Sequence, residues 1–360
     1  MVAGGTGGHI FPALAVAEEL RVRGARLERF GTEYSIEFLG TTRPLESRLI
    51  PGAGFPLRTI KAAGLKGISG LQGLRNLMLL PRTAVSTAWV LRDFQPQVVV
   101  GVGGYLAGPV MVEAALRDIP TLLIEPNALP GFTNRALAPL VRVAALGFEQ
   151  AARFYGEKAH VTGLPVRAAF HAIPSKRHEA PSSVLIVGGS QGSRAINEVM
   201  VRCAPLLSRE SAWLKVVHQT GDAGYNAVRE AYLKQNLAAH VCAFIDDMAG
   251  ALAQSDLVIS RAGAAAVAEL AAAGRAALLI PFPAATDQHQ QANARAFEQA
   301  GAARVILQTE LKPERLMKDV HELLSDPTRL IEMERAAKAL ARPEAAARIA
   351  DLVEELAAKA

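Results

Sequence analysis

Short apolar runs alternate with longer stretches of helical periodicity along most of the chain. The apolar runs are rich in β-branched residues and end in glycines or polar residues, at 98–104, 121–127, 183–193, 241–247, 256–263 and 276–283. Helical patterns lie between them, for example at 195–207 and 264–274. This alternation predicts an α/β protein with parallel sheets that helices cover on both faces.

Glycine-rich loops follow three of the predicted strands, "GGTGGH" (4–9), "GVGGYLAGP" (101–109) and "GGSQGS" (188–193). Glycine lets the backbone turn tightly and approach a ligand, and the N-terminus of the next helix favours a phosphate. Tight strand-to-helix turns are the alternative for any one loop. Three such loops in one chain favour anion binding, and their repetition predicts two Rossmann-like halves.

The two familiar nucleotide fingerprints are absent from these loops. Ile10 and Leu106 stand where GxGxxG needs its third glycine, and no GxxxxGK[ST] occurs. There is also no D-x-D pair, because Asp246 and Asp247 are adjacent. We therefore expect backbone amides and a few cations, without a metal ion, to neutralise a bound diphosphate.

The length of the chain predicts two domains, since 360 residues with 50% hydrophobic content exceed one typical core. We expect an N-terminal domain over 1–163 and a second domain over 164–341, with a hinge early in the proline-containing stretch 160–183. An amphipathic Ala/Glu-rich helix at 342–360 is expected to pack back on the first domain. Ligands of such sheets bind beyond the carboxyl ends of the strands, so both sets of strand ends are expected to face one cleft.

The strand before the first glycine loop is unusually short. Only Met1, Val2 and Ala3 precede it. We therefore expect the natural chain to begin further upstream.

Charge and composition limit the classes of molecule that the chain is expected to bind. The chain has 39 basic and 34 acidic residues, a formal charge of +5, which suits an acidic ligand or an anionic membrane surface. Aromatic content of 5% and the lack of a dense basic run argue against nucleic acid. Two isolated cysteines argue against structural zinc and for a reducing compartment. No secretory leader or membrane-spanning stretch is seen.

One stretch, 62–91, mixes apolar residues with Lys66, Arg75 and Arg82. It predicts either a lipid-touching surface flanked by positive charge or an ordinary core helix.

Three positions carry candidate chemistry. His9 lies at the start of a predicted helix, whose positive end favours the neutral imidazole of a general base; a capping role is the alternative. Glu269, in an apolar helix, suits a ribose diol unless it faces solvent. A polar cluster suited to a sugar follows the last apolar run, with an N-cap at Thr286 or Asp287 as the plainer explanation of part of it. Its members are Asp287, His289, Gln290, Gln291 and Asn293.

Seven segments occur in a familiar order over nearly the whole chain: "GGTGGH", "GVGGYLAGP", "GLPVR", "GGSQGS", "FIDDM", "SRAGAAAVAEL" and Asp-Gln-His-Gln-Gln-Ala-Asn. With them the chain resembles the MurG family of peptidoglycan glycosyltransferases. The resemblance implies a GT-B fold, UDP-N-acetylglucosamine (UDP-GlcNAc) as donor, and undecaprenyl-diphosphate-linked MurNAc-pentapeptide (lipid I) as acceptor. It also implies an inverting reaction that forms a β-1,4 bond, and a peripheral position on the cytoplasmic face of the cell membrane.

The resemblance further implies roles for single residues. For the donor, Ser190 and Arg167 would contact the nucleotide diphosphate side, the Ile245 backbone would read uracil, and Glu269 would hold the ribose. Backbone groups of Ala264 and Ala265 would lie near the diphosphate and sugar, and Gln290 and Asn127 would reach the GlcNAc. Thr6, Gly7, Gly8 and His9 would line the catalytic side, and Gly103, Gly104 and Tyr105 would cradle the acceptor diphosphate.

Two departures from the family pattern affect these roles. Pro126 stands where relatives often have glutamine, which removes one amide beside Asn127. His289 stands where some relatives have glutamine.

Two other interpretations of the sequence involve the same UDP-GlcNAc-binding domain. One is another GT-B enzyme that uses UDP-GlcNAc, such as a 2-epimerase, and the other is a non-catalytic nucleotide-sugar binder. The N-terminal loops and the 62–91 stretch favour the lipid-diphosphate acceptor.

Overall fold

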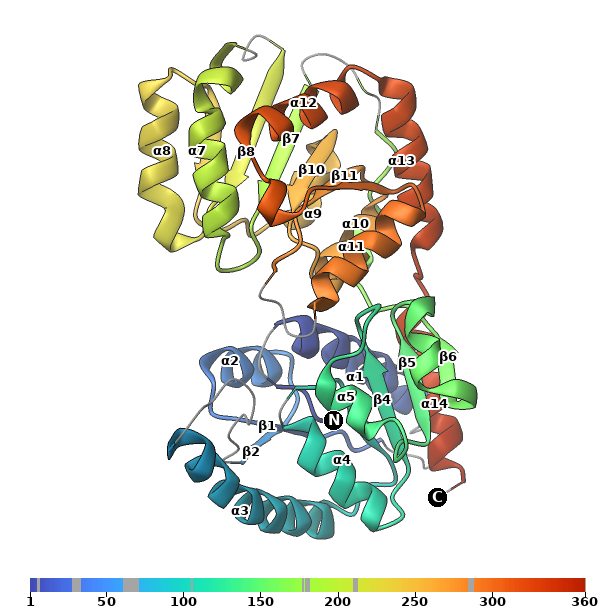
Figure 1. The fold of residues 1–360 in the computed structure, drawn as a ribbon. Coiled ribbons are helices and arrows are strands. Elements are labelled where there is room, and N and C mark those ends of the chain that lie inside the picture. Colours follow the sequence, from blue (N-terminus) through green and yellow to red (C-terminus); the bar gives the residue numbers. More distant parts are fainter. Residues whose placement is uncertain are drawn as a thin grey trace. The chain divides into compact units, whose positions relative to one another are not determined.

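The computed structural model describes residues 1–4, 7–27, 34–60, 71–104, 106–176, 178, 182–209, 213–283 and 288–359. Contacts divide the chain into two compact units (Figure 1). Unit 1 is Met1–Val166 together with Arg342–Ala360, and unit 2 is Arg167–Ala341.

Unit 2 is built on a sheet of six parallel strands in the order β12-β11-β10-β7-β8-β9. The strands are β7 (Ser182–Val187), β8 (Leu214–Gln219), β9 (Ala239–Cys242), β10 (Leu257–Ser260), β11 (Ala277–Leu279) and β12 (Ala303–Val305). Counted from β7, this is the doubly wound order 6-5-4-1-2-3. The order reverses between β7 and β10, which is where such sheets bind ligands.

Helices cover this sheet. They are α6 (Ala168–His171), α7 (Arg194–Arg209), α8 (Tyr225–Lys234), α9 (Met248–Gln254), α10 (Ala264–Ala273), α11 (His289–Gln299), α12 (Pro313–Leu324) and α13 (Pro327–Leu340). In α7, apolar residues at three- and four-residue spacing, such as Ile196, Met200 and Cys203, are buried. They pack against inward-facing strand residues such as Val184 and Val216. Because this apolar face packs on the sheet, α7 runs back along it, and its N-terminus lies near the carboxyl end of β7.

The sheet of unit 1 has the same strand order with one more strand at its edge. Its strands are β1 (Phe38–Gly40), β2 (Leu57–Thr59), β3 (Val99–Gly101), β4 (Thr121–Glu125), β5 (Val143–Leu146) and β6 (Ala159–Val161). β1 pairs with β2, and β3 to β6 pair in succession, all in parallel.

The first three residues join these two pieces into one sheet. Val2 forms parallel bridges to both Leu39 of β1 and Gly101 of β3. Its amide donates to the Val100 carbonyl at 2.7 Å, and its carbonyl accepts from Val102 at 3.1 Å. Met1–Ala3 therefore takes the central position of a first strand, and the strand order reverses between it and β3.

The helices of unit 1 are α1 (Gly7–Leu27), α2 (Pro44–Gly52), α3 (Leu71–Phe94), α4 (Ala107–Leu116), α5 (Phe132–Leu137) and α14 (Ala345–Ala357). The C-terminal helix α14 packs on α1. Arg23 of α1 joins the two, because its guanidinium donates to Asp351 at 2.6 Å, Glu354 at 2.8 Å and the Ala347 carbonyl at 3.0 Å.

The predicted strands are present, and each ends before the glycine or polar end of its run. The difference is large in the run 241–247, where β9 ends at Cys242. The rest forms a loop in which the Asp247 carboxylate accepts from the Gly250 amide at 2.9 Å and caps α9. This N-cap explains why the strand stops early. Within the described residues, no helix is both long enough and apolar enough to cross a bilayer.

Candidate functional site

A pocket of about 650 Å³ opens in unit 2 at the carboxyl ends of β7 and β10. This is the position where the strand order reverses, and the volume falls in the range of small-molecule sites. Its lining comes from the loop after β7, the first turn of α7, the loop after β10, and side chains that follow β11 and β12: Val187, Gly188, Gly189, Gly192, Ser193, Arg194, Ala195, Glu198, Ser260, Arg261, Gly263, Ala266, Phe282, Gln290 and Gln308.

The loop 188–193 needs its glycines for steric reasons. Gly192 has φ +72°, and a Cβ added to it would lie 1.8 Å from the Thr220 carbonyl oxygen. A Cβ on Gly188 would lie 2.2 Å from the Ser193 amide nitrogen. The loop therefore turns closely enough to lead into α7 at Arg194, and the first amides of α7 lie at the pocket wall. Ser190 is exposed at the tip of this loop.

Arg261 supplies a cation to the pocket, and our sequence analysis missed it. Its guanidinium donates to the Ile280 carbonyl at 3.1 Å and to Gln308 Oε1 at 2.8 Å, and it lies 5.3 Å from the ring centroid of Phe282. Burial lowers the pKa of Arg261 to about 10, so the group stays charged at neutral pH. Its place directly after β10 was the signal, because strand ends are where such sheets bind ligands.

Three predicted donor residues, Gln290, Ala264 and Ala265, lie at or beside this pocket. Gln290 lines it, and its Oε1 accepts from the Phe282 amide at 3.0 Å. Ala264 begins α10 directly after Gly263, which lines the pocket, so the first turn of a second helix also starts here. Ala265 follows it and is half-buried. Two helix N-termini and one arginine at one pocket make a site for an anion.

Glu269 and Arg167 lie together elsewhere in unit 2. Burial raises the pKa of Glu269 to about 7, and the charge of Arg167 opposes that rise. Arg167 is exposed, with its guanidinium 4.8 Å from the Phe170 ring centroid. Among the described residues, no hydrogen bond or ion pair to the Glu269 carboxylate is formed, so a polar ligand could satisfy it. Ile245 is half-buried in the loop after β9.

The corresponding position in unit 1 holds His9. His9 lies in the first turn of α1, and its Nδ1 is 3.2 Å from the Gly4 carbonyl oxygen. A proton on Nδ1 would be donated to that carbonyl, which leaves the lone pair on Nε2. Gly104, with φ +83°, packs against the same place, because a Cβ on it would be 3.1 Å from the Gly4 oxygen and 3.9 Å from His9 Nδ1. Two of the predicted glycine loops thus meet at this histidine.

Asn127 follows β4 and is held by Glu125. Its amide nitrogen and its Nδ2 donate to Glu125 Oε1 at 2.8 and 3.2 Å. Gly103 and Gly104 have φ of +97° and +83°, so both need glycine in the loop before α4. Gly7 and Gly8 lie in the first turn of α1.

Some predicted positions fall outside the described residues. They are Thr6, Tyr105, Thr286, Asp287 and the first part of the 62–91 stretch. In the part of the chain that is described, no three His, Cys, Asp or Glu side chains gather as ligands for a metal ion.

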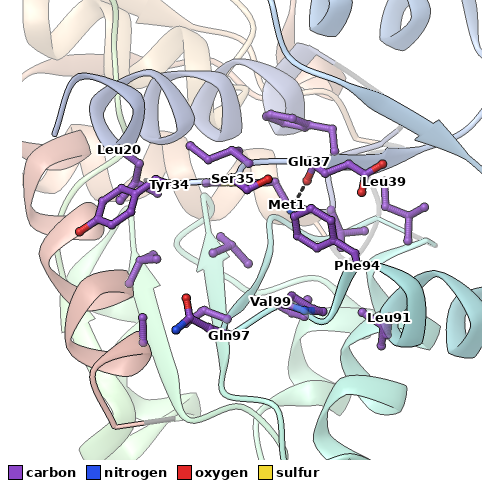
Figure 2. A pocket seen from close by; sticks show the side chains of 18 of the residues that line it. Met1, Leu20, Tyr34, Ser35, Glu37, Leu39, Leu91, Phe94, Gln97 and Val99 are labelled. Atoms are coloured by element: carbon purple, nitrogen blue, oxygen red, sulfur yellow. Dashed lines mark hydrogen bonds between the residues drawn. The ribbon is translucent and has the colours of Figure 1, made fainter. Parts of the chain in front are cut away.

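A second pocket, of about 610 Å³, lies in unit 1 (Figure 2). Met1, Glu37 and Val99 line it, together with Phe94 and Gln97. These residues lie at or just before the amino ends of their strands, the edge opposite the glycine loops. Since ligands of parallel sheets bind at the carboxyl ends, this pocket is not at the edge where a ligand of the sheet is expected.

Comparison with known proteins gives the class and then the family. The fold matches the crystal structure of Acinetobacter baumannii MurG with a TM-score of 0.79 and 33% identity, over 99% of this chain and 98% of that one. It also matches a UDP-GlcNAc 2-epimerase from Neisseria meningitidis bound to UDP-GlcNAc, with a TM-score of 0.66 and 14% identity, over 98% of both chains. That second likeness concerns the fold alone. Two parallel α/β units of this kind make the chain a GT-B protein, as the sequence predicted.

Family models match both halves. The glycosyltransferase family 28 N-terminal domain matches residues 1–145, and the family 28 C-terminal domain matches residues 183–349. The chain belongs to glycosyltransferase family 28. A relative from Myxococcus xanthus, 45% identical over 99% of this chain and 92% of its own length, is named UDP-N-acetylglucosamine--N-acetylmuramyl-(pentapeptide) pyrophosphoryl-undecaprenol N-acetylglucosamine transferase. One from Syntrophotalea carbinolica bears the same name at 44% identity, over 97% of this chain and 96% of its own.

Proposed function

We propose that this chain transfers GlcNAc from UDP-GlcNAc to the 4-hydroxyl of the MurNAc-pentapeptide of lipid I, giving lipid II for peptidoglycan synthesis. The names of its relatives support this acceptor and donor. The observation that carries it is the unit 2 pocket, where a glycine loop, two helix N-termini and Arg261 meet at the reversal of the strand order.

The reaction is a displacement at the anomeric carbon of GlcNAc. The acceptor 4-oxygen forms the new bond on one face while the bond to the UDP oxygen breaks on the other, which inverts the configuration. His9 Nε2 takes the proton of the hydroxyl, and the bond from Nδ1 to the Gly4 carbonyl fixes the tautomer and the ring orientation. UDP leaves with the electron pair of the broken bond.

The negative charge that develops on the leaving diphosphate needs stabilisation. The amides of the 188–193 loop, the N-termini of α7 and α10 and the Arg261 guanidinium supply it in our proposal. Such groups are fixed before the reaction and act with little reorganisation, which is why they lower barriers effectively. Ser190 would add a hydroxyl to this set.

The remaining donor contacts are proposals for single groups. Glu269 would accept from the ribose hydroxyls, with Arg167 beside it, and the backbone of Ile245 would pair with uracil. Gln290 and Asn127 would bind the GlcNAc hydroxyls. Since Phe282 and Glu125 already hold these two amide side chains, little ordering would be needed when the sugar binds.

We also propose that unit 1 binds the cytoplasmic face of the cell membrane through α3 and α4. These two helices pack side by side (Figure 1). Val85 and Trp89 are 70% and 63% exposed on one face of α3, and Val112 and Leu116 are 37% and 76% exposed on one face of α4. Exposed arginines follow each pair, Arg92 and Arg117. Apolar side chains with flanking cations suit an anionic lipid surface.

Vesicle sedimentation tests the membrane proposal. Vesicles that contain anionic lipid should retain the protein, and the double variant Trp89→Ser/Leu116→Ser should lower the partition coefficient at least ~10-fold, because both exposed anchors are lost. Leu233→Ser is the matched control, since Leu233 is 59% exposed on α8 of unit 2. Equal binding of all three proteins would contradict the proposal.

The transfer reaction is tested with radiolabelled UDP-GlcNAc and a short-chain analogue of lipid I. Label should appear in a lipid-linked disaccharide. Label in a free epimer would instead support a 2-epimerase, and donor binding with no product would support a non-catalytic binder. Either outcome would overturn the proposed function.

A further inference from the structure

A carboxylate lies wholly buried behind the glycine loops of unit 1. Glu125 ends β4 and is 0% exposed. Its Oε1 accepts from the amide and the side chain of Asn127, and its Oε2 accepts from Asn134 Nδ2 at 2.7 Å. The Gly131 amide is a further donor to it. Glu125 thus fixes both ends of the loop between β4 and α5.

The contacts continue from Asn134 to the histidine. Asn134 is buried, and a Cβ on Gly103 would lie 2.9 Å from its Oδ1, so the amide packs directly on the Gly103 backbone. Gly104 follows and packs against the Gly4 carbonyl and His9 Nδ1. A continuous series of contacts therefore runs from Glu125 through Asn134 and the loop after β3 to the bond that orients His9.

We propose that Glu125 is a positioning residue for the transfer reaction: through Asn134 and the Gly103–Gly104 loop it sets the acceptor side of the site and the orientation of His9. This inference rests on the proposed function. Glu125 does not need to touch either substrate for this role. Its direct partners are Asn127 and Asn134, and every step to His9 lies within unit 1.

The ionisation of Glu125 gives the role a pH dependence. Burial raises the pKa of Glu125 to about 7, and the hydrogen bonds from Asn127, Asn134 and Gly131 oppose that rise. The Tyr155 hydroxyl interacts with the Glu125 charge, and Arg135 in turn interacts with Tyr155. Only the carboxylate accepts from all its donors at once, so the loops should be held more firmly above pH 7 than below it.

A double variant that exchanges the acid at position 125 and the amide at position 134 distinguishes a positioning role from a purely stabilising role of Glu125. In Glu125→Gln, the new Nε2 faces another donor, Asn134 Nδ2, so Asn134 must turn its amide over to accept with Oδ1, which changes the amide face packed on Gly103. In Glu125→Gln/Asn134→Asp, the glutamine Oε1 still accepts from Asn127 while its Nε2 donates to the new carboxylate. We expect the single variant to lose ~10–100-fold in kcat/KM for the acceptor, the size of effect that is typical when a residue that orients a functional side chain is lost. The double variant should recover most of that loss.

The pH profile gives a second readout. The ratio of wild-type to Glu125→Gln kcat should shrink as the pH falls from 8 to 6, because the wild-type carboxyl becomes neutral like the glutamine. Taking the ratio removes the pH dependence that both proteins share. The dissociation constant of UDP, whose proposed contacts all lie in unit 2, should not change.

Glu37→Gln is the matched control. Glu37 is a poorly exposed carboxylate of the same unit, paired with Arg58 at 2.7 Å at the opposite edge of the sheet. It should keep wild-type kinetics. A loss of melting temperature in Glu125→Gln with unchanged kcat/KM, or no recovery in the double variant, would overturn the inference. Absence of transfer by the wild type would instead overturn the proposed function.

Discussion

The two units share one strand order and differ in what they place where that order reverses. In unit 2 the position holds a pocket with a half-buried arginine and two helix N-termini, all favourable to negative charge. In unit 1 it holds a histidine at the meeting of two glycine loops, with a buried carboxylate behind them. In our proposal, one scaffold thus serves two tasks, anion binding and proton transfer, and the loop residues decide which.

The glycine loops themselves sharpen this comparison. Replacing Gly192 with alanine should have the largest effect, because the new Cβ would meet the Thr220 carbonyl carbon and oxygen and φ is +72°. We expect a loss of more than about 4 kcal/mol in unfolding free energy, which removes the pocket of unit 2. Circular dichroism during urea denaturation measures it.

Gly189→Ala is the control in the same loop. Gly189 has φ +90°, but its Cβ would meet no described atom within 4 Å. It should cost only about 1–2 kcal/mol, the backbone strain alone. Similar losses in both variants would show that the close approach to Thr220 is unimportant.

His9→Ala tests the division of tasks between the units. We expect kcat to fall about 10²–10⁴-fold, the usual contribution of a general base, while UDP-GlcNAc affinity stays unchanged. Single-turnover kinetics and calorimetry measure the two quantities. Near-normal turnover would remove the base role from unit 1.

Glu269→Gln tests the donor side. The carboxylate accepts hydroxyl hydrogens better than the neutral acid, and burial raises the pKa of Glu269 to about 7. The wild type should therefore bind UDP-GlcNAc more tightly as the pH rises from 6 to 8. The diphosphate of UDP-GlcNAc stays fully ionised over this range, so it does not contribute to the change. The variant should bind about 10-fold more weakly at pH 8 and lose this pH dependence.

The same substitution should stabilise the protein without ligand. The pKa of Glu269 is higher in the folded than in the unfolded chain, so the folded state loses stability as the pH rises from about 4.5 through 7. At pH 8 the uncharged glutamine avoids that cost, which the shift in pKa puts at about 3 kcal/mol. A variant that is both less stable and weaker in binding would argue for a structural role.

The smallest expected effect is on the ion pairs that join α1 to α14 in unit 1. Arg23→Ala should cost about 1 kcal/mol, because its ion pairs to Asp351 and Glu354 are partly exposed. Hydrogen exchange should increase in α14 and not in unit 2. Arg295→Ala is the control, since Arg295 pairs with Glu298 in its own helix. Equal exchange in both variants would contradict the prediction.

The sequence predicted what local patterns control. Strand–glycine–helix units show in the alternation of apolar runs, so the α/β class, the two Rossmann-like halves and the three loops could be predicted directly, whereas the GT-B fold was implied by the family resemblance. Arg261 follows a predicted strand, but its place beside the loop 188–193 depends on the pairing of β10 with β7, strands far apart in the chain. The contact of Asn134 with Gly103 is equally non-local. The predicted strand at 241–247 was too long because apolar content alone did not reveal the N-cap at Asp247.

The position of α14 has a consequence for how the protein is made. Residues Ala345–Ala357 belong to unit 1, yet a ribosome produces them only after all of unit 2. Unit 2 is one continuous segment of the chain and can form all its contacts once it has been synthesised. Unit 1 begins earlier but cannot complete its contacts until α14 has left the exit tunnel of the ribosome. A nascent chain stalled anywhere in between carries an α1 without its partner, a feature by which chaperones and proteases can distinguish unfinished from finished molecules.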